Sequence, residues 1–179
     1  MGKCEPGQDG NVAAISVFLM CNGFLVVKNM EKDEKFMQEA LKEAHKSFDL
    51  DEVPVGVVIV KDGKIIARGH NTRESKQDPT AHAEINAIKK ASKKLKSWRL
   101  IGCKMYVTLE PCSMCAGAIM WSRIDEVIYG AKDLKGGALG SSYNLFEQKG
   151  INHFPKIVSG IKEDEASELL KKFFKSKRK

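Results

Sequence analysis

Residues 53–69, VPVGVVIVKDGKIIARG, set the architecture of the chain. The first eight residues are rich in valine and show no polar alternation, which is typical of a strand buried on both faces. Asp62 and Gly63 stand at the centre of KDGK, and Asp-Gly favours a tight hairpin turn. IIARG then returns as a second strand. The segment therefore predicts a β-hairpin that opens a covered sheet.

Helices and strands alternate after this hairpin. A polar loop, NTRESKQDP, leads into a predicted helix from Thr80 to Leu95, with Asp78 or Thr80 as its cap. KMYVTL, residues 104–109, is typical of a strand. Pro111 then favours the first turn of an apolar helix, CSMCAGAIMWSR, because a proline there loses no hydrogen bond.

Two more strands are predicted in the second half of the chain. They are DEVIYG, residues 125–130, and KIVSGI, residues 156–161. The connection over residues 132–155 is rich in Gly, Ser and Asn and longer than most loops in compact domains, which favours a functional loop.

Amphipathic helices are predicted before the hairpin and at the end of the chain. From near Glu31, apolar residues recur at three- and four-residue steps, at Phe36, Met37, Ala40, Leu41, Ala44 and Phe48. The closing helix shows the same spacing, at Ala166, Leu169, Leu170, Phe173 and Phe174. We therefore predict an α/β fold, a three-layer α/β/α sandwich with a central mixed five-stranded sheet that is largely parallel after the hairpin.

Length and charge limit the possible functions. The chain has 179 residues and a net charge of +7, which suits one globular domain and favours anionic partners such as nucleic acid. There is no acidic residue from Ile85 to Leu109, where seven cations fall, and the last nine residues, KKFFKSKRK, are also basic. A solvated surface explains either cluster alone, but two clusters favour a phosphate-lined partner.

Five cysteines form an odd set in a chain that is too large to need disulfide bonds, so metal-binding or catalytic thiols are the better interpretation. The apolar stretch from Val12 to Val27 lacks the flanks of a signal peptide and is shorter than the roughly 20 residues that span a bilayer. We expect no membrane association. Thiol ligands indicate the reducing cytoplasm.

Two short motifs carry the chemistry. HAE, residues 82–84, and PCSMC, residues 111–115, each lie where a loop or strand enters a helix, and Cys112 and Cys115 share one face of a first turn. With His82 they offer three ligands to one zinc ion per chain, which leaves a fourth position open to water, as in catalytic sites. A closed structural site remains the alternative, since His45, His70, His153 and Cys103 are also present.

Glu84 lies two residues from His82, so it is near the metal without having to bind it. A glutamate in a first helical turn is usually only a favourable partner of the helix dipole. Beside a histidine ligand, and followed after 26 intervening residues by PCxxC, it is better interpreted as a proton carrier for water activated by the zinc.

H-x-E followed by P-C-x-x-C is the signature of zinc-dependent nucleobase deaminases. DPTAHAEINAI, YVTLEPCSMCAGAI and GAKDLKGGALGS, at residues 78–88, 106–119 and 130–141, closely resemble the bacterial tRNA-specific adenosine deaminases of the cytidine and deoxycytidylate deaminase family. The resemblance covers about residues 31–178. It implies a cytidine-deaminase-like fold and hydrolytic conversion of adenosine to inosine at the wobble position of a tRNA anticodon.

The resemblance also assigns roles to residues. It places zinc on His82, Cys112 and Cys115 and the proton shuttle on Glu84. It places substrate contacts on Asn71, Asp133 and Asn152, and RNA contacts on Phe174, Lys175 and Arg178. A turn asparagine is the other interpretation of Asn71, and a core position is the more frequent role of a phenylalanine at helical spacing. The expected partners are a tRNA anticodon stem-loop and a second copy of the chain in a homodimer.

Two other functions remain open. A deaminase of free guanine or of a cytosine nucleoside would share the zinc chemistry, and guanine deaminases can share DPTAHAE. A non-catalytic zinc module that binds RNA would not need Glu84. The family usually begins just before the first amphipathic helix, so we expect residues 1–29 to be an extension, from an upstream start or without fixed structure, and residues 30–179 to be the deaminase domain.

Overall fold

The computed structural model describes the backbone of residues 12–178 and the side chains of residues 30–178. The chain divides into two compact units, Met1–Lys32 and Asp33–Lys179. Helix α1 (Val12–Asp49) contributes residues to both units. It begins well before the helix that we predicted from near Glu31. No proline interrupts residues 12–30, and Gly23 is their single glycine, so the backbone there can continue the helix.

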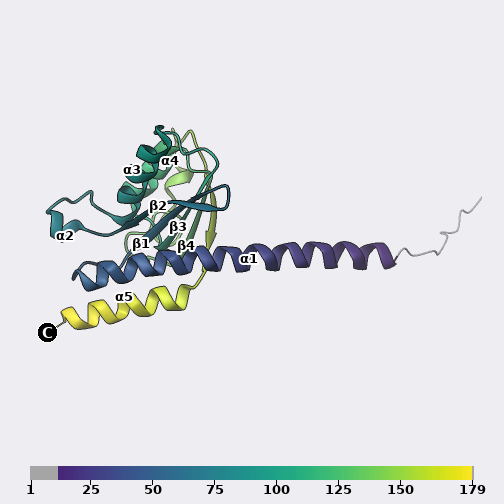
Figure 1. Ribbon diagram of the computed structural model, residues 1–179, viewed down its shortest axis with the longest axis horizontal. Helices are drawn as coiled ribbons and strands as arrows, with labels where there is room; N and C mark the ends of the chain where they lie inside the picture. The colour runs from purple at the N-terminus through teal and green to yellow at the C-terminus, as the bar shows by residue number, and fades with distance from the viewer. Residues whose placement is uncertain (1–11, 179) are drawn as a thin grey trace, which may run out of the picture. The chain divides into compact units, whose positions relative to one another are not determined.

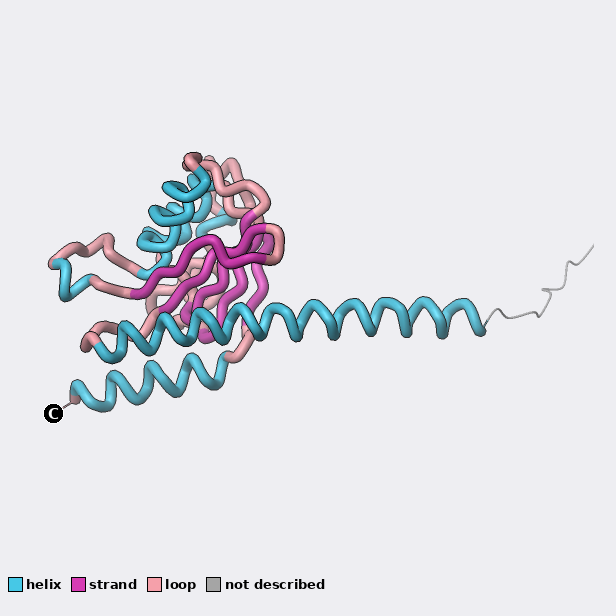
Figure 2. The backbone as a smooth tube through the Cα atoms, viewed as in Figure 1, coloured by secondary structure: helices cyan, strands magenta, loops and turns pink. Residues whose placement is uncertain are grey.

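A mixed five-stranded sheet forms the centre of the unit Asp33–Lys179, and Figure 2 shows its strands side by side. The strand order is β2-β1-β3-β4-β5. β1 pairs antiparallel with both β2 and β3, whereas β3, β4 and β5 are mutually parallel. The predicted architecture is confirmed, with strands β1 (Gly56–Lys61), β2 (Lys64–His70), β3 (Cys103–Leu109), β4 (Glu126–Ala131) and β5 (Lys156–Ser159).

The hairpin has the predicted turn and the predicted burial. Asp62 and Gly63 have φ values of 49° and 70°, which suits the mirror-image turn that matches the twist of the two strands. Val57 and Ile59 enter the core on one side of the sheet, and Val58 and Val60 enter the core on the other side. Successive strand side chains point to opposite faces, so a sequence without polar alternation fills both cores.

Helices cover both faces of this sheet (Figure 1). α3 (Ala83–Leu95) and α4 (Ser113–Ser122) pack on one face, and α5 (Glu163–Lys177) lies on the other with residues 33–49 of α1. The Tyr106 hydroxyl donates to Asp33 Oδ1 at 2.7 Å and so ties α1 to β3. Among the helices that the structure describes, none has the length and apolar character that crossing a bilayer requires.

Three local predictions need correction. α3 begins at Ala83 with His82 as its N-cap, and Asp78 instead accepts hydrogen bonds from Thr80 in the preceding turn. α4 begins at Ser113 with Cys112 as its N-cap, so Pro111 precedes the helix. The loop after β2 contains a short helix, α2 (Arg73–Lys76), and a 3₁₀ turn (Leu145–Glu147) lies within residues 132–155.

Candidate active site

The metal-ligand candidates come together where α3 and α4 begin. His82 is the N-cap of α3, Cys112 is the N-cap of α4, and Cys115 lies in the first turn of α4. His82 Nδ1 lies 3.7 Å from Cys112 Sγ and 3.6 Å from Cys115 Sγ. All three ligand atoms lie within 4.8 Å of one another. Because these residues belong to the two helix starts on one sheet face, the fold itself assembles the cluster.

The distances fit tetrahedral zinc. In such a site the zinc–sulfur bond is about 2.3 Å long and the zinc–nitrogen bond about 2.05 Å. At the tetrahedral angle between these two bonds, the nitrogen and the sulfur lie roughly 3.6 Å apart. The observed nitrogen–sulfur distances of 3.6 and 3.7 Å agree with that value. Two thiols and an imidazole are also a usual zinc donor set. Among the described residues no fourth His, Cys, Asp or Glu joins the cluster, so it resembles a catalytic site more than a closed structural one.

The electrostatics of the cluster favour a cation. Hydrogen bonding with Cys115, and then with His82, lowers the pKa of Cys112 to about 4 despite its burial, so this thiol is charged at neutral pH. The contact with Cys112, together with burial, raises the pKa of Cys115. The raised pKa means that Cys115 keeps its thiol proton, and a metal cation that binds the sulfur replaces this proton.

Glu84 projects from the first turn of α3 and is 4% exposed. Burial raises the pKa of its carboxyl group above the usual value. Glu84 lines a cavity of about 120 Å³ together with His82, Cys112, Asn71 and Asp133. The structure therefore brings the predicted proton carrier, two metal-ligand candidates and two predicted substrate contacts to one cavity.

Asn71, directly after β2, lines this cavity and carries an acceptor that is unpaired within the described part of the chain. Its Nδ2 donates to Glu52 Oε2 at 3.4 Å, and because a carboxylate only accepts, this bond fixes which way the amide faces. Asn71 Oδ1 is buried and has no hydrogen-bond partner among the described residues. A buried carbonyl oxygen of this kind requires a donor, so the side chain is set to bind an N–H of a ligand.

Glu52 holds the loop that follows Asn71. Its carboxylate is 1% exposed and accepts from the backbone N–H groups of Glu74 at 3.1 Å and Ser75 at 2.7 Å. Burial raises the pKa of Glu52, but these two backbone hydrogen bonds outweigh it, and the pKa lies below its ordinary value. The carboxylate therefore caps α2, and Arg73 of this helix lines the cavity.

Asn86 closes the same loop from α3. Its Nδ2 lies 2.9 Å from the His70 carbonyl oxygen and 3.1 Å from that of Ala81. The two ends of the loop over residues 71–81 are thus joined through one side chain, which lies two residues after Glu84.

Glu110 organises the opposite wall of the cavity. Its carboxylate is 2% exposed and accepts from the N–H groups of Asp133 at 3.2 Å, Leu139 at 2.9 Å and Ser141 at 3.1 Å. A Cβ on Gly137 would come within 2.5 Å of this carboxyl group, so only glycine fits there. Asp133 lines the cavity, and its Oδ1 accepts from the backbone of Lys135 and Gly136 in its own turn.

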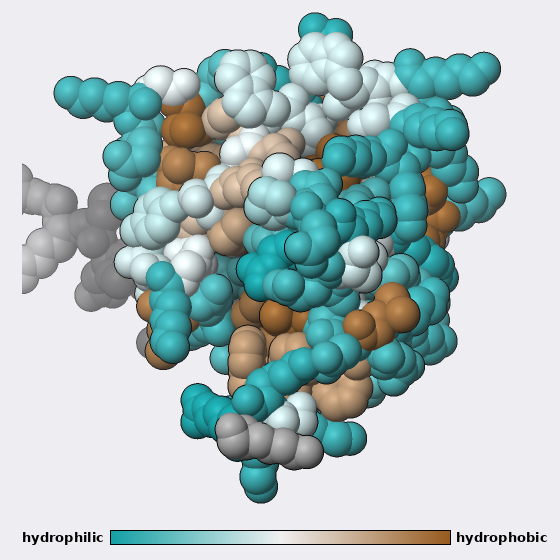
Figure 3. All heavy atoms as spheres, turned by 90° about the vertical axis from the view of Figure 1, so that its left-hand side faces the viewer, coloured by the Kyte–Doolittle hydropathy of each residue, from teal (hydrophilic) through white to brown (hydrophobic). Residues whose placement is uncertain are grey.

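A groove of about 960 Å³ continues from the cavity, because Val53, Leu109 and Asp133 line both. Figure 3 looks onto this end of the molecule and shows apolar side chains among hydrophilic ones. The groove contains the three residues predicted to contact RNA, Phe174, Lys175 and Arg178, with Lys132, Lys135 and Lys171. Phe174 is 47% exposed, whereas Phe173 is buried and packs edge-on to Phe48.

Asn152 lies elsewhere. It is exposed, and its Oδ1 accepts from Arg123 Nη1 at 2.6 Å, next to the C-terminal end of α4. It does not line the cavity around Glu84. Its contact with substrate stays a prediction.

Sequence reasoning missed Glu52, Asn86 and Glu110 as residues of the site. Each stands beside a stretch with a stronger signal of its own: Glu52 precedes the hairpin strand, Asn86 follows HAE, and Glu110 precedes PCSMC. An acidic residue directly between a buried strand and a proline was a signal for Glu110, because a carboxylate there must find buried partners.

Comparisons with known proteins agree with this geometry. The cytidine and deoxycytidylate deaminase zinc-binding region matches residues 30–131. The tRNA-specific adenosine deaminase of Bacillus subtilis (strain 168) is 49% identical over 150 residues, which cover 84% of this chain and 93% of that protein. The protein of the same name from Agrobacterium fabrum is 47% identical over 149 residues, covering 83% of this chain and 98% of that protein.

Solved structures show the same likeness. One, from a study of tRNA A34 deaminases that edit adenosine to inosine at the wobble position, superposes with a TM-score of 0.73 and 46% identity. The match covers 76% of this chain and 99% of that one. The guanine deaminase of Bacillus subtilis matches with a TM-score of 0.53 and 46% identity over 55% of this chain and 64% of that one.

Proposed function

This chain belongs to the zinc-dependent cytidine and deoxycytidylate deaminase family, and from that premise we propose that it converts adenosine to inosine at the wobble position of a tRNA anticodon. Its relatives of nearly full length bear the name tRNA-specific adenosine deaminase. One observation carries the proposal: the His82, Cys112 and Cys115 cluster and Glu84 meet at a cavity that continues into a basic groove. A free base needs no such groove.

In this proposal His82 Nδ1 and the sulfurs of Cys112 and Cys115 hold the zinc ion. Bound there, zinc supplies the Lewis-acid activation of water that hydrolysis at neutral pH requires. Glu84 moves the protons: its carboxylate takes one from the attacking water and delivers it to N1 of adenine, and it then carries a second one to the amino group that leaves C6. Adenosine and water become inosine and ammonia.

Asn71 orients the base. Its Oδ1 is fixed by the bond between Nδ2 and Glu52, and it accepts a hydrogen bond from an N–H of the purine edge. Asp133 contacts the neighbouring nucleotide from the other wall. The groove then binds the rest of the loop, with Phe174 as a stacking surface and Lys175 and Arg178 against phosphates.

The test is to incubate the zinc-loaded protein with an anticodon stem-loop that has adenosine at the wobble position, with free guanine and cytidine in parallel. We expect inosine from the stem-loop alone. Turnover of guanine or cytidine instead would show that the substrate is a free base or nucleoside.

A Glu84→Gln variant separates an enzyme from a binding module. We expect it to keep its zinc content and RNA affinity and to lose turnover, because the amide cannot carry the proton. If the variant converts adenosine as fast as the unsubstituted protein, Glu84 is not the proton carrier.

We also infer a homodimer formed through α4. Met114, Gly117, Ala118 and Trp121 recur at helical spacing on the outer side of α4, and Trp121 is 59% exposed. An apolar stripe of this kind on a charged protein favours association with a second copy.

Two further expectations rest on the same family. Residence in the cytoplasm suits thiol ligands and a tRNA substrate. The division into an extension over residues 1–29 and a deaminase domain over residues 30–179 stays a prediction. N-terminal sequencing of the native protein tests whether the extension comes from an upstream start, and an intact Met1 or Gly2 terminus would contradict that origin.

A further inference from the structure

The flank of α3 carries four lysines, which we call the lysine flank: Lys89, Lys90, Lys93 and Lys94. All four are exposed. Lys89 and Lys93 lie on the side of the helix opposite the fully buried Ala87 and Ala91, and Lys90 and Lys94 lie beside the buried side. Lys90 Nζ donates to the Arg68 carbonyl oxygen, so the flank lies beside β2, the edge strand of the sheet. None of the ion pairs formed by the described residues includes these four lysines.

This flank begins next to the active site. α3 starts with His82 as its N-cap, and Lys89 lies two turns further along. Hydrogen bonds from Thr80, and then the charges of Lys89 and Lys76, lower the pKa of Asp78 in the loop before the helix. At 1.5 Å per residue, Lys94 lies about 16 Å along the axis from the first residue of α3. A stretch of positive charge thus leads away from the cavity.

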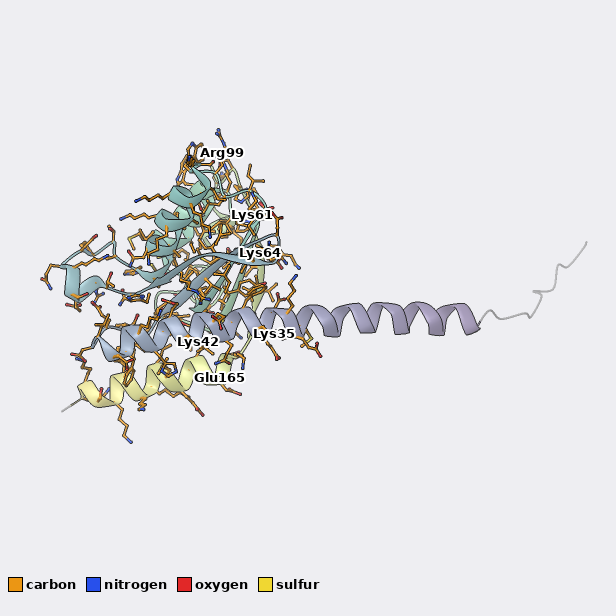
Figure 4. All side chains as sticks on the ribbon, in the orientation of Figure 1. Lys35, Lys42, Lys61, Lys64, Arg99 and Glu165 are labelled. Carbon is orange, nitrogen blue, oxygen red and sulfur yellow. The ribbon has the colours of Figure 1, made fainter. Side chains whose placement is uncertain are left out.

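The flank is separate from the basic groove. The groove is built by α5 and the loop after β4, on the side of the sheet opposite α3 (Figure 1). Beyond the lysine flank, Lys96 and Arg99 are also exposed, and Figure 4 shows Arg99 past the end of α3. Like charges at three- and four-residue spacing destabilise a helix, and none of these four lysines forms an ion pair among the described residues, which points to an anionic ligand.

We propose that the lysine flank binds the phosphate backbone of the anticodon stem, while the basic groove binds the loop. This inference rests on the proposed function, because it takes the tRNA as the ligand of the cavity. A tRNA is favoured over an acidic protein because the flank continues directly from the site where the RNA loop must enter, and phosphates supply negative charge at regular spacing along a duplex.

The experiment compares two double variants that each remove two positive charges from one exposed helix surface. The first is Lys89→Gln with Lys93→Gln on the flank. The control is Lys35→Gln with Lys42→Gln on α1, which lies across the sheet from α3 (Figure 4). Glutamine keeps a polar side chain and the helix propensity of these positions, and the exposed sites leave folding intact.

Each protein is assayed for inosine on a stem-loop with a full anticodon stem and on a hairpin whose stem is cut to two base pairs. For the flank variant we expect KM on the full stem to rise about fivefold, because each exposed ionic contact contributes a fraction of a kcal/mol. We expect the slope of log affinity against log salt to fall by about 1.8, at about 0.9 per phosphate contact. kcat, and KM on the short hairpin, should stay unchanged.

Three results would overturn the inference: an unchanged KM and salt slope, an equal loss in the control variant, or an equal loss on the short hairpin. If the flank binds an acidic protein and the flank variant binds RNA as well as the unsubstituted protein does, the flank belongs to that other class of partner. This result would also overturn the inference. Failure of the proposed function looks different, because the unsubstituted protein would then make no inosine from either RNA.

Discussion

Glu110 shows how a single buried carboxylate shapes the active site without touching the metal ligands. Its two oxygens accept from three backbone N–H groups of the loop over residues 133–141, which contains Asp133. A charged group buried to this extent is tolerated because backbone donors surround it. The position of Asp133 at the cavity therefore depends on Glu110.

Replacing Glu110 by Gln should remove the hydrogen bond to Asp133 and keep the hydrogen bonds to Leu139 and Ser141. The amide oxygen can still accept from Leu139 and Ser141, but the amide nitrogen then faces the N–H of Asp133, and two donors repel. We expect Glu110→Gln to lower the free energy of unfolding by about 1–3 kcal/mol and to raise KM for the stem-loop more than it lowers kcat. Denaturant unfolding, zinc content and steady-state kinetics measure this. Unchanged stability and KM would show that the carboxylate does not hold the loop.

At the residue level, the sequence predicted the groups with a chemical signature and missed the groups that position them. His82, Cys112, Cys115 and Glu84 were predicted as a cluster, because ligand types and helical spacing limit where they can lie. Glu52 and Glu110 act through backbone donors that are 22 to 31 residues away in the chain, and no local pattern encodes such a contact.

Among the elements, α3 packs closely against the edge strand β2. A Cβ on Gly69 of β2 would lie 2.2 Å from the Ala83 carbonyl oxygen and 2.8 Å from the Ala87 nitrogen, both in the backbone of α3. A side chain there would push α3 outward and move His82 and Glu84 away from α4. We expect Gly69→Ala to lower the free energy of unfolding by about 3 kcal/mol and to weaken zinc binding.

Thermal unfolding and zinc titration measure these two effects. Gly117→Ala is a matched control, because a Cβ at Gly117 meets no atom within 4 Å. If Gly69→Ala binds zinc as tightly as the control, the close approach does not set the position of α3.

Glu126 links three strands and gives a prediction of pH dependence. Its carboxylate pairs with Lys104 of β3 at 2.5 Å and with Lys156 of β5 at 3.0 Å. Burial raises the pKa of Glu126, but the hydrogen bonds from the two lysines outweigh it and hold the pKa below its ordinary value of 4.5. The folded state therefore binds this proton at a lower pH than the unfolded state does.

The stabilisation by Glu126 is complete above pH 4.5 and is lost as the pH falls through the lowered pKa. Because both lysines are exposed, we expect no more than about 1 kcal/mol from the pair. The difference in unfolding free energy between the unsubstituted protein and Glu126→Gln should therefore shrink as the pH is lowered from 6 to about 3. A difference that is constant over this range would contradict the assignment.

The sequence predicted the order of the elements well and their ends less well. The hairpin and the later strands follow from β-branched runs and an Asp-Gly turn, which are local signals. The start of α3 was placed three residues early, because Asp78 and Thr80 are good helix caps that here cap a separate turn. α2 was missed because its cap, Glu52, comes from a distant part of the chain.

On the scale of the whole molecule, the lysine flank on α3 and the basic groove beside α5 belong to helices on opposite faces of the sheet, and the cavity lies at the start of α3. The sequence predicted two basic clusters but not their arrangement, because that depends on which sheet face each helix covers. The apolar stripe of α4 lies on neither basic surface. A dimer formed through α4 would therefore leave both surfaces open to RNA.

Gly117 offers a way to break this dimer without harming the fold. An added side chain at Gly117 meets no atom within 4 Å, and any residue other than proline improves helix propensity over glycine. We therefore expect Gly117→Lys to keep or slightly raise the thermal stability of each protomer. Placed in the centre of an apolar interface, the ammonium group would be buried without a partner, which costs several kcal/mol.

Sedimentation equilibrium should then show a dimer for the unsubstituted protein at micromolar concentration and a monomer for Gly117→Lys, whereas Gly117→Ala should remain a dimer. A monomer in the unsubstituted protein, or a dimer that tolerates Gly117→Lys, would show that copies of this chain do not associate through α4.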